Sequence, residues 1–508
     1  MFPANRVLAL SGALLYCVLA ADPAGAQQAA AVSAAAAAPV CDVEQMSPTP
    51  LAKAAIARNK VVSAKSAEDA MKGVREALKE VFDKGTATNP LGRDYVAAQF
   101  LILAVEFGGE SQLRGDLNFP GDKKASLDLL VTADSLLDIV EAAKPLCMEE
   151  TTQWREYKPF AKRIELAYGA LQANQLDSAQ RSVERALIMS DRAPQTYDVL
   201  WRIADARNDE PTQVKYLQLT VDKLAPDTAN ARTRSNLLFN LGRIQQGMAE
   251  KAEGARKAEL YKAADKAYLE VVAEYPASQE SPFAINAMSV AWAVTQDSSA
   301  AIKTLETIRP MLAKLGDVAL GQAGFIAVRL NRTAEAASIF KAATEQNPYL
   351  RDYLYNYAAT LFDLRRSAEM LPIVARLLAV DPSNPDNVLL YAYAFKGMAD
   401  STNDAAAKKA YTDSAVVYST KSDGMKTKVL YTSIDRGREA TTLQGEVENR
   451  GTAARTYTLE FEFVDTAGAV VEKKSVTVGP VAANGMSTFK VEIAKGGVAG
   501  VRYAPVPQ

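Results

Sequence analysis

The 508-residue sequence contains no histidine. Without an imidazole, a His-dependent catalytic triad, a His-ligated zinc site and a histidine general base are excluded. An excess of one charge sign is also lacking, since 58 basic residues stand against 60 acidic ones and the formal net charge is -2. The chain therefore has no electrostatic basis for binding nucleic acid or anionic lipid, and a partner has to be recognised by shape.

Motifs for the common kinds of catalysis are absent as well. The sequence has no nucleophile elbow, no Walker phosphate loop and no glycine-rich dinucleotide motif after a strand. A pair of carboxylates can hydrolyse a glycoside without histidine, but no pattern singles out such a pair among 60 acidic residues. We therefore predict no enzymatic activity, no catalytic residue, no metal site and no cofactor.

Long apolar runs are scarce, and the one at the start resembles a secretory signal peptide. Arg6 precedes an apolar run from Val7 to Ala21, and Ala24-Gly25-Ala26 follows with small residues at cleavage spacing. The alternative, a membrane anchor, needs roughly 20 apolar residues, more than this run supplies. We predict a signal peptide over residues 1–26, cleavage near Ala26, and an exported mature chain, periplasmic or secreted, with no transmembrane segment.

Cysteine is rare, with three in the whole chain. Removal of the signal peptide takes Cys17 with it and leaves Cys41 and Cys147. An oxidising compartment makes such a pair a disulfide candidate, and the alternative is two unrelated thiols. The bridge would attach the start of the mature chain to the helical body.

The first part of the mature chain divides into a leader and a helical region. Residues 27–48 are rich in alanine and are predicted to be a flexible leader. Over residues 49–153 apolar residues recur at helical spacing, with Gly and Pro between the runs. This region is predicted to form antiparallel helical hairpins, with the clearest helices over Ala67–Phe82, Asp94–Phe107 and Ser126–Ala143.

From residue 154 to 422 the sequence repeats itself. In the clearest unit, Asp317–Leu350, a first helix carries Gly324, and a second carries Ala336, Phe340 and Ala343. Small residues let the two helices approach, and Phe340 fills the space between them. Pro382 follows Pro348 by 34 residues, which is the tetratricopeptide period. These residues resemble the tetratricopeptide repeat family.

The resemblance extends over about seven units and implies a mainly α fold, a tetratricopeptide-like α-solenoid of helical hairpins. One unit, from Ser235 onward, contains an insertion of about ten residues rich in Ala, Glu and Lys. The other units are Phe160–Ala193, Gln195–Pro226, Ser281–Leu315, Asp317–Leu350, Tyr353–Ala379 and Pro385–Tyr418.

In this family ligands bind on the concave face, which the first helix of each unit lines. The resemblance therefore implies binding-groove candidates at Tyr168, Phe325, Arg329, Tyr355, Phe362, Tyr393 and Lys396. Tyrosine offers a large contact area at low entropic cost, which suits an extended peptide or glycan. The alternative is that half of these side chains pack between helices. Ile164 and Tyr168 stand where chaperone-binding relatives carry a Lys and an Asn, so a carboxylate clamp is not expected.

Beyond residue 425 the hydrophobic period changes from helical to two. Alternating apolar residues such as Leu443, Gly445 and Val447 predict half-buried antiparallel strands separated by turns. Residues 425–508 are therefore predicted to form a small all-β sandwich. The run from Phe461 to Asp465, together with Gly468, resembles the FxLYD-type immunoglobulin-like domain, which implies a fold and an extracytoplasmic setting.

The leading functional hypothesis is an exported, non-enzymatic interaction scaffold. It would bind a partner polypeptide of the cell envelope in the concave groove and use the β-sandwich as a second docking surface. One alternative is a glycan-binding or glycan-processing protein whose aromatic side chains stack on sugar rings. Another is a structural spacer whose repeats set a distance between other components.

Overall fold

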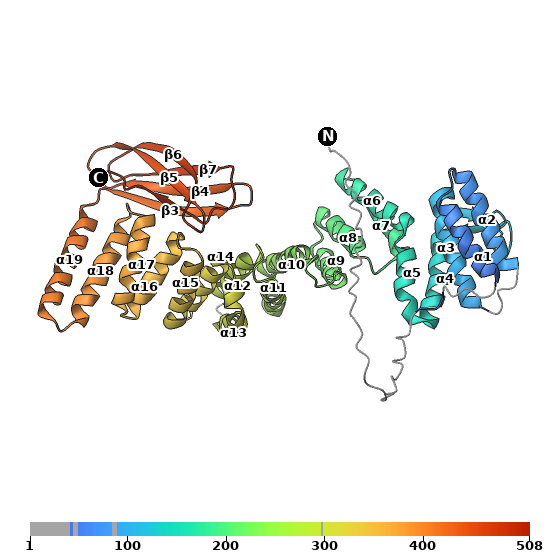
Figure 1. The fold of residues 1–508 in the computed structure, drawn as a ribbon, viewed down its shortest axis with the longest axis horizontal. Helices are drawn as coiled ribbons and strands as arrows, with labels where there is room; N and C mark the ends of the chain where they lie inside the picture. Colours follow the sequence, from blue (N-terminus) through green and yellow to red (C-terminus); the bar gives the residue numbers. More distant parts are fainter. Residues whose placement is uncertain (1–40, 44–48, 84–88, 296–297, 508) are drawn as a thin grey trace, which may run out of the picture.

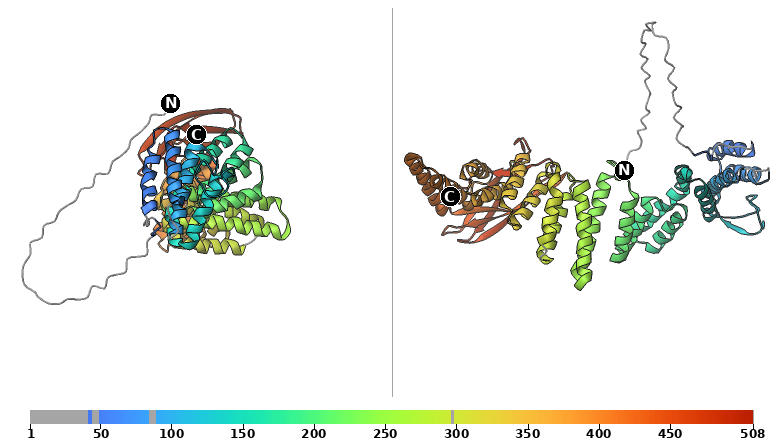
Figure 2. Two further views of the ribbon diagram at one scale, coloured as in Figure 1. Left: turned by 90° about the vertical axis from the view of Figure 1, so that its right-hand side faces the viewer. Right: turned by 90° about the horizontal axis from the view of Figure 1, so that it is seen from below.

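A computed structural model describes residues 41–43, 49–83, 89–295 and 298–507 of the chain. It shows a long row of helices with a β-sandwich lying against its C-terminal end (Figure 1). Two further views show the same row end-on and from below (Figure 2). The fold is thus a mainly α helical solenoid followed by a small all-β unit, as the sequence predicts. The predicted signal peptide and most of the leader lie outside the described residues.

The N-terminal block consists of helices packed around one apolar helix. Pro90 opens that helix, and the side chain of Asn89 caps it by accepting a hydrogen bond from the Gly92 amide at 2.8 Å. Apolar residues surround its whole circumference, so it is buried on every side. The helices of the block are α1 (Thr49–Val62), α2 (Ala67–Asp83), α3 (Pro90–Gly108), α4 (Leu129–Ala143), the 3-10 turn η2 (Pro145–Cys147) and α5 (Met148–Arg155).

One prediction in this block is wrong. Ser126–Asp128 was expected to begin a helix but forms strand β2, which pairs antiparallel with β1 (Ser111–Leu113). The reason is the cap of α4. The Asp128 side chain accepts hydrogen bonds from the amides of Leu130 and Val131 and caps the helix. This cap requires an extended backbone at Asp128, so the helix begins at Leu129.

After α5 the chain forms successive helix pairs, each packed against the next. Each pair covers its neighbour, and the buried apolar residues form two large clusters, one from the N-terminal block to α8 and the other from α9 to α18. The pairs are α6 (Lys158–Gln172) with α7 (Leu176–Met189), α8 (Pro194–Ala206) with α9 (Glu210–Lys223), α10 (Ala231–Lys251) with α11 (Gly254–Glu274), α12 (Ser281–Thr295) with α13 (Ser298–Ile308) and the 3-10 helix η3 (Arg309–Lys314), α14 (Asp317–Arg329) with α15 (Thr333–Gln346), α16 (Arg351–Asp363) with α17 (Ser367–Val380), and α18 (Pro385–Ser401) with α19 (Ala405–Gly424).

Glycines set the distance between the two helices of a pair. A Cβ atom on Gly324 would lie 2.6 Å from the ring of Phe340, and one on Gly242 would lie 2.5 Å from the ring of Tyr268. Both distances are too short for a real contact, so only glycine allows each aromatic ring to lie against the first helix. The role predicted for Gly324 and Phe340 is the one that they have.

The third pair contains the inserted residues that the sequence predicts, and they are helical. Its helices α10 and α11 each span 21 residues, so the extra residues lengthen both helices. The inserted residues are mostly Ala, Glu and Lys, which are among the strongest helix formers, and a longer helix satisfies their backbone hydrogen bonds.

The C-terminal unit contains two three-stranded antiparallel sheets, with strand orders β3-β4-β7 and β6-β5-β8. Alternate side chains of both sheets meet in one core that includes Leu443, Phe461 and Phe489. The strands are β3 (Thr427–Arg436), β4 (Thr441–Asn449), β5 (Arg455–Val464), β6 (Val470–Val481), β7 (Met486–Ile493) and β8 (Gly500–Tyr503).

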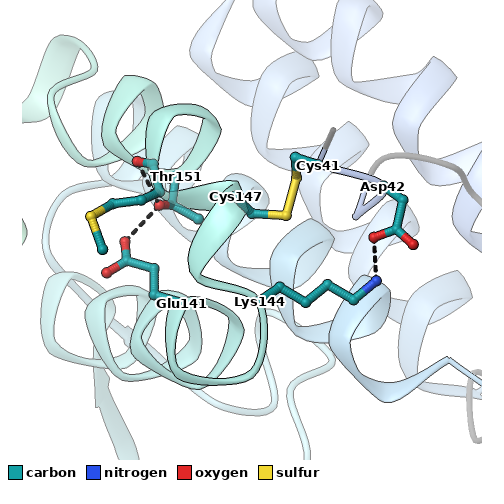
Figure 3. Close-up of a disulfide and its surroundings, with 7 residues drawn as sticks. Cys41, Asp42, Glu141, Lys144, Cys147 and Thr151 are labelled. Atoms are coloured by element: carbon teal, nitrogen blue, oxygen red, sulfur yellow. Dashed lines mark hydrogen bonds and ion pairs between the residues drawn. A yellow bond between two sulfur atoms is a disulfide. The ribbon is translucent and has the colours of Figure 1, made fainter. Parts of the chain in front are cut away.

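A disulfide joins the start of the described chain to the N-terminal block (Figure 3). It links Cys41 to Cys147, the pair expected from the sequence, and an ion pair between Asp42 and Lys144 lies beside it. Val43, the next residue, is buried in the core of the block. The bridge therefore fixes this short segment against the helices.

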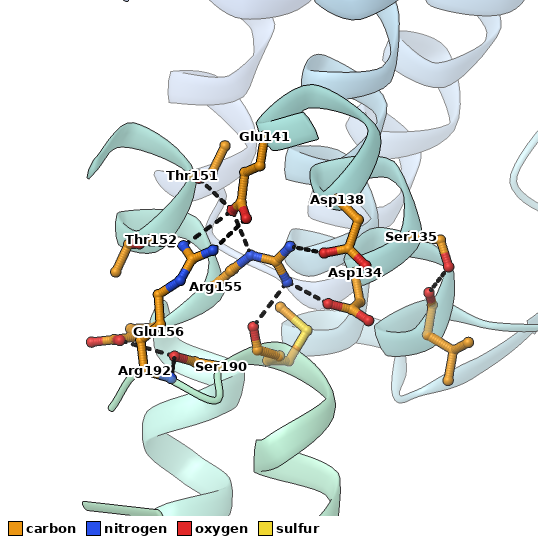
Figure 4. A network of polar contacts seen from close by, with 12 residues as sticks. Asp134, Ser135, Asp138, Glu141, Thr151, Thr152, Arg155, Glu156, Ser190 and Arg192 are labelled. Atoms are coloured by element: carbon orange, nitrogen blue, oxygen red, sulfur yellow. Dashed lines mark hydrogen bonds and ion pairs between the residues drawn. The ribbon is translucent and has the colours of Figure 1, made fainter. Parts of the chain in front are cut away.

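An ion-pair network connects the N-terminal block to the repeats (Figure 4). Arg155 is 4% exposed and pairs with Asp134, with Asp138 at 2.6 Å and with Glu141 at 2.8 Å. Arg192, in the turn between α7 and α8, pairs with the other oxygen of Glu141. Each of these carboxylates pairs with an arginine, so their charges are compensated within the network. The network connects α4, α5 and the repeats, and we interpret it as structural.

Candidate functional site

Three large apolar side chains remain exposed on the first helices of consecutive repeats. Val328 on α14, Phe362 on α16 and Tyr393 on α18 are 42%, 44% and 41% exposed. Val328 and Phe362 occupy equivalent positions one repeat apart. Exposed apolar groups that recur in this way are typical of an interaction surface. We call these three residues the apolar track.

Two of the predicted groove residues meet in this track. The ring centroids of Phe362 and Tyr393 lie 5.4 Å apart, with the ring planes inclined by 33°. Lys396 follows on the same helix, and its side chain is 70% exposed and 3.6 Å from Asp400. An ion pair so exposed contributes little to stability, so Lys396 remains available to a partner.

Two other predicted aromatic residues are mainly occupied in packing. Phe325 is half-buried, and its ring lies 5.5 Å from that of Phe340 and 6.2 Å from that of Tyr353, centroid to centroid. Tyr355 is also half-buried, and the guanidinium of Arg351 lies 5.8 Å from its ring centroid. The sequence left open whether some of the groove candidates pack between helices. Phe325 and Tyr355 do so.

The last two predicted residues are bound to neighbouring helices. Arg329 donates hydrogen bonds to the Ser289 hydroxyl at 2.8 Å and to its carbonyl oxygen at 3.1 Å. Tyr168 lies far from the track, on α6, and its hydroxyl donates to Asp198 at 2.6 Å. Burial, together with this hydrogen bond, raises the pKa of Tyr168. The other oxygen of Asp198 accepts from the Trp201 indole at 2.8 Å, so Tyr168 belongs to a closed polar cluster.

A second aromatic pair was not predicted. Phe239 on α10 and Phe283 on α12 have ring centroids 6.3 Å apart, and Phe283 is 63% exposed. Counted from the unit starts Ser235 and Ser281, they lie four and two residues into their units. Tyr168, Phe325 and Tyr393 each lie eight residues into theirs, so the periodic groove positions did not include the pair.

Two further features concern chemistry and membranes. Within the described ranges, Asp, Glu and Cys side chains nowhere gather in a group of three or more that could hold a metal ion. None of the helices in the described part of the chain has both the length and the apolar character needed to span a bilayer.

Comparison with known proteins finds similarity only among solved structures. No protein-family profile matches the sequence. No curated protein matches it by sequence search. The resemblance of residues 425–508 to the FxLYD-type domain therefore stays a prediction.

The similar solved structures include helical-repeat proteins. One is Pseudomonas aeruginosa PilF, with 12% identity over 52% of this chain and 90% of PilF and a TM-score of 0.21. A tetratricopeptide repeat protein from Parabacteroides merdae has 13% identity over 53% of this chain and 93% of its own, with a TM-score of 0.25. A chain of the APC/C hetero-tetramer Cut9-Hcn1 has 10% identity over 67% of this chain and 76% of its own, with a TM-score of 0.24. The repeat fold of this chain is established by its own helix pairs and their packing.

Proposed function

We propose that this protein is an exported, non-enzymatic scaffold that binds a segment of a partner polypeptide along the first helices of its repeats. The observation that carries the proposal is the exposed pair Phe362 and Tyr393, next to the exposed Lys396. Aromatic side chains contribute large contact areas to protein interfaces, and a neighbouring cation can pair with an acidic side chain of the bound segment.

The exported setting and the second docking surface are further parts of the proposal. The disulfide between Cys41 and Cys147 supports export, because such bonds persist in oxidising compartments. One side of the β-sandwich lies against the repeats (Figure 1), so a second docking surface would use strands turned away from them, such as β6.

The test is capture of partners by the full-length protein in its native host, with crosslinking and mass spectrometry. The double variant Phe362→Ala, Tyr393→Ala is compared with the wild type. The control is Ile139→Ala on α4, a residue that is 49% exposed and lies outside both the track and the β-sandwich. We expect the double variant to lose the main partner and the control to retain it.

Two results would contradict the proposal. Recovery of identical partners by the double variant would exclude the track as the binding site. Binding of the wild type to a glycan array, lost in the double variant, would show that the aromatic pair recognises sugar rings.

A further inference from the structure

The β-sandwich lies along the turns that join the last three repeats (Figure 1). Its contacts fall at three places in the helical array: the start of α14, the end of α15 and the segment between α17 and α18. The first two places belong to the repeat of α14 and α15, and the third joins the repeat of α16 and α17 to that of α18 and α19, so the sandwich contacts three successive repeats.

The first contact is a charged one. Arg436 on β3 donates to both oxygens of Asp317, at 2.9 and 3.0 Å. Asn347, at the end of α15, donates to Asp317 at 2.6 Å and to the Ala499 carbonyl at 2.8 Å. Burial alone would raise the pKa of Asp317, but the hydrogen bonds and the charge of Arg436 outweigh it and lower the pKa. A two-pronged arginine contact of this kind fixes orientation as well as distance.

The second contact is centred on a buried carboxylate. Asp381 ends α17 and is 1% exposed. One of its oxygens accepts the hydroxyl of Tyr503 on β8 at 2.5 Å, and the same hydroxyl accepts the Ser383 amide at 3.1 Å. The other oxygen accepts from Arg351 at 2.9 Å and from Asn387 at 2.8 Å. One carboxylate thus connects β8 to the starts of α16 and α18.

The third contact uses the backbone of the segment between α17 and α18. The Val429 amide on β3 donates to the Ser383 carbonyl at 3.0 Å, and the Val506 amide donates to the Ser383 hydroxyl at 2.8 Å. Lys428 pairs with Asp386 at 2.8 Å. Both ends of the sandwich sequence therefore hold the same turn.

We propose that the β-sandwich is an internal brace that fixes the relative orientation of the last three repeats. In a solenoid each repeat contacts only its neighbours, so small changes at each interface add up to bending. A rigid unit bonded to three successive repeats opposes that bending. Because it holds the starts of α16 and α18, it also sets the spacing of the helices that carry Phe362 and Tyr393.

The test is hydrogen exchange with mass spectrometry on the full-length chain. Arg436→Ala removes the contact to Asp317, and Tyr503→Phe removes the hydroxyl while keeping the ring in the core. We expect amides of α14–α18 to exchange about tenfold faster in each variant, while those of α6–α9 keep the wild-type rate. The matched control is Arg502→Ala. It removes a hydrogen bond inside the sandwich, from Arg502 to Glu462 at 2.8 Å, and is expected to leave the exchange rates of α14–α18 unchanged.

Exchange in β4 and β5 reports whether the sandwich stays folded. If Arg436→Ala unfolds it, the comparison is made with Tyr503→Phe, whose ring still fills the core. The proposal would be overturned if α14–α18 exchanged at the wild-type rate in a variant that has lost its contact to the repeats. This holds whether the sandwich of that variant stays folded or detaches from the repeats. Equal acceleration by Arg502→Ala would also overturn it.

Discussion

Phe362 and Tyr393 lie with their ring centroids 5.4 Å apart and remain 44% and 41% exposed. Phe340 and Tyr353 also pair, with centroids 6.4 Å apart, but both are buried between helices. The Phe340–Tyr353 pair therefore contributes to packing, whereas the Phe362–Tyr393 pair leaves an accessible surface. This difference can be measured as a difference in stability.

Removal of the buried ring is predicted to destabilise the repeats far more than removal of the exposed one. Phe340→Ala empties a site that is 0% exposed and is expected to lower the free energy of unfolding by about 3–5 kcal/mol. Phe362→Ala is expected to cost about 1 kcal/mol or less, because much of its ring already contacts water. Denaturant unfolding followed by helical circular dichroism measures both. Equal losses would show that Phe362 is a packing residue.

Two glycine substitutions are predicted to act in opposite directions. Gly324→Ala places a methyl group 2.6 Å from the Phe340 ring, and the overpacking is expected to cost about 1–3 kcal/mol. Gly247→Ala on α10 has open space around the new Cβ and is expected to stabilise the helix by about 0.5–1 kcal/mol. Thermal unfolding of the two variants checks the prediction, and stabilisation by Gly324→Ala would contradict it.

The turns between paired helices offer a stabilising substitution. Asn174, Asn208 and Asn331 adopt a left-handed backbone there, with φ of 55° to 56°, and Arg365 does the same with φ of 56°. Asparagine tolerates this conformation better than arginine, so Arg365→Asn is expected to raise the free energy of unfolding by about 0.5–1 kcal/mol. The reciprocal change Asn331→Arg should lower it in the same unfolding assay. A loss of stability in Arg365→Asn would argue against backbone strain at this turn.

Reduction of the disulfide is predicted to loosen one end of the molecule only. The bridge closes a loop of 106 residues, and its loss is expected to destabilise the N-terminal block by about 2–4 kcal/mol. Hydrogen exchange with and without reductant is the measurement, with the Cys41→Ser, Cys147→Ser variant as a reductant-independent control. Faster exchange is expected in α1–α5 and unchanged exchange in β3–β8, and the reverse distribution would refute the prediction.

The network around Glu141 predicts sensitivity to acid. Burial alone would raise the pKa of Glu141, but hydrogen bonds from Arg192, Arg155 and Thr151 lower it to about 2. A lowered pKa means that the stabilisation is complete above the ordinary pKa of a glutamate and is lost as the pH falls from there towards 2. Burial raises the pKa of nearby Asp134 despite its contact with Arg155. Protonation of Asp134 in acid therefore opposes the loss of stability that protonation of Glu141 causes.

The acid sensitivity is checked by unfolding the wild type and Glu141→Gln across this pH range. The glutamine variant should be less stable at neutral pH, and its stability should fall less steeply in acid. Parallel pH profiles for the two proteins would show that Glu141 is not the responsible group.

Local sequence patterns predicted most of the elements. The 34-residue period, the small residue opposite Phe340 and the alternation in residues such as Leu443 and Val447 each depend on near neighbours. The prediction of a helix was wrong at Ser126–Asp128. These residues belong to the apolar pattern of α4, but they form a strand, and Asp128 caps the helix that follows. Capping depends on one side chain, which a periodic pattern does not reveal.

The sequence by itself determined the class of the fold and the repeat, and it made Cys41 and Cys147 a disulfide candidate, because period, composition and cysteine number are local or countable properties. The structure decided that these two cysteines are bonded. Only the tertiary structure decided which first-helix aromatic residues are exposed. Phe325 and Phe362 both lie on first helices, yet Phe325 packs against Phe340 and Tyr353, whereas Phe362 pairs with Tyr393 and stays 44% exposed.

The placement of the β-sandwich was likewise decided by tertiary structure. Asn347 reaches the Ala499 carbonyl across 152 residues of sequence, and Arg436 reaches Asp317 across 119. A contact between residues so far apart leaves no periodic trace in either segment, because it depends on the curvature that all the intervening helix pairs produce together.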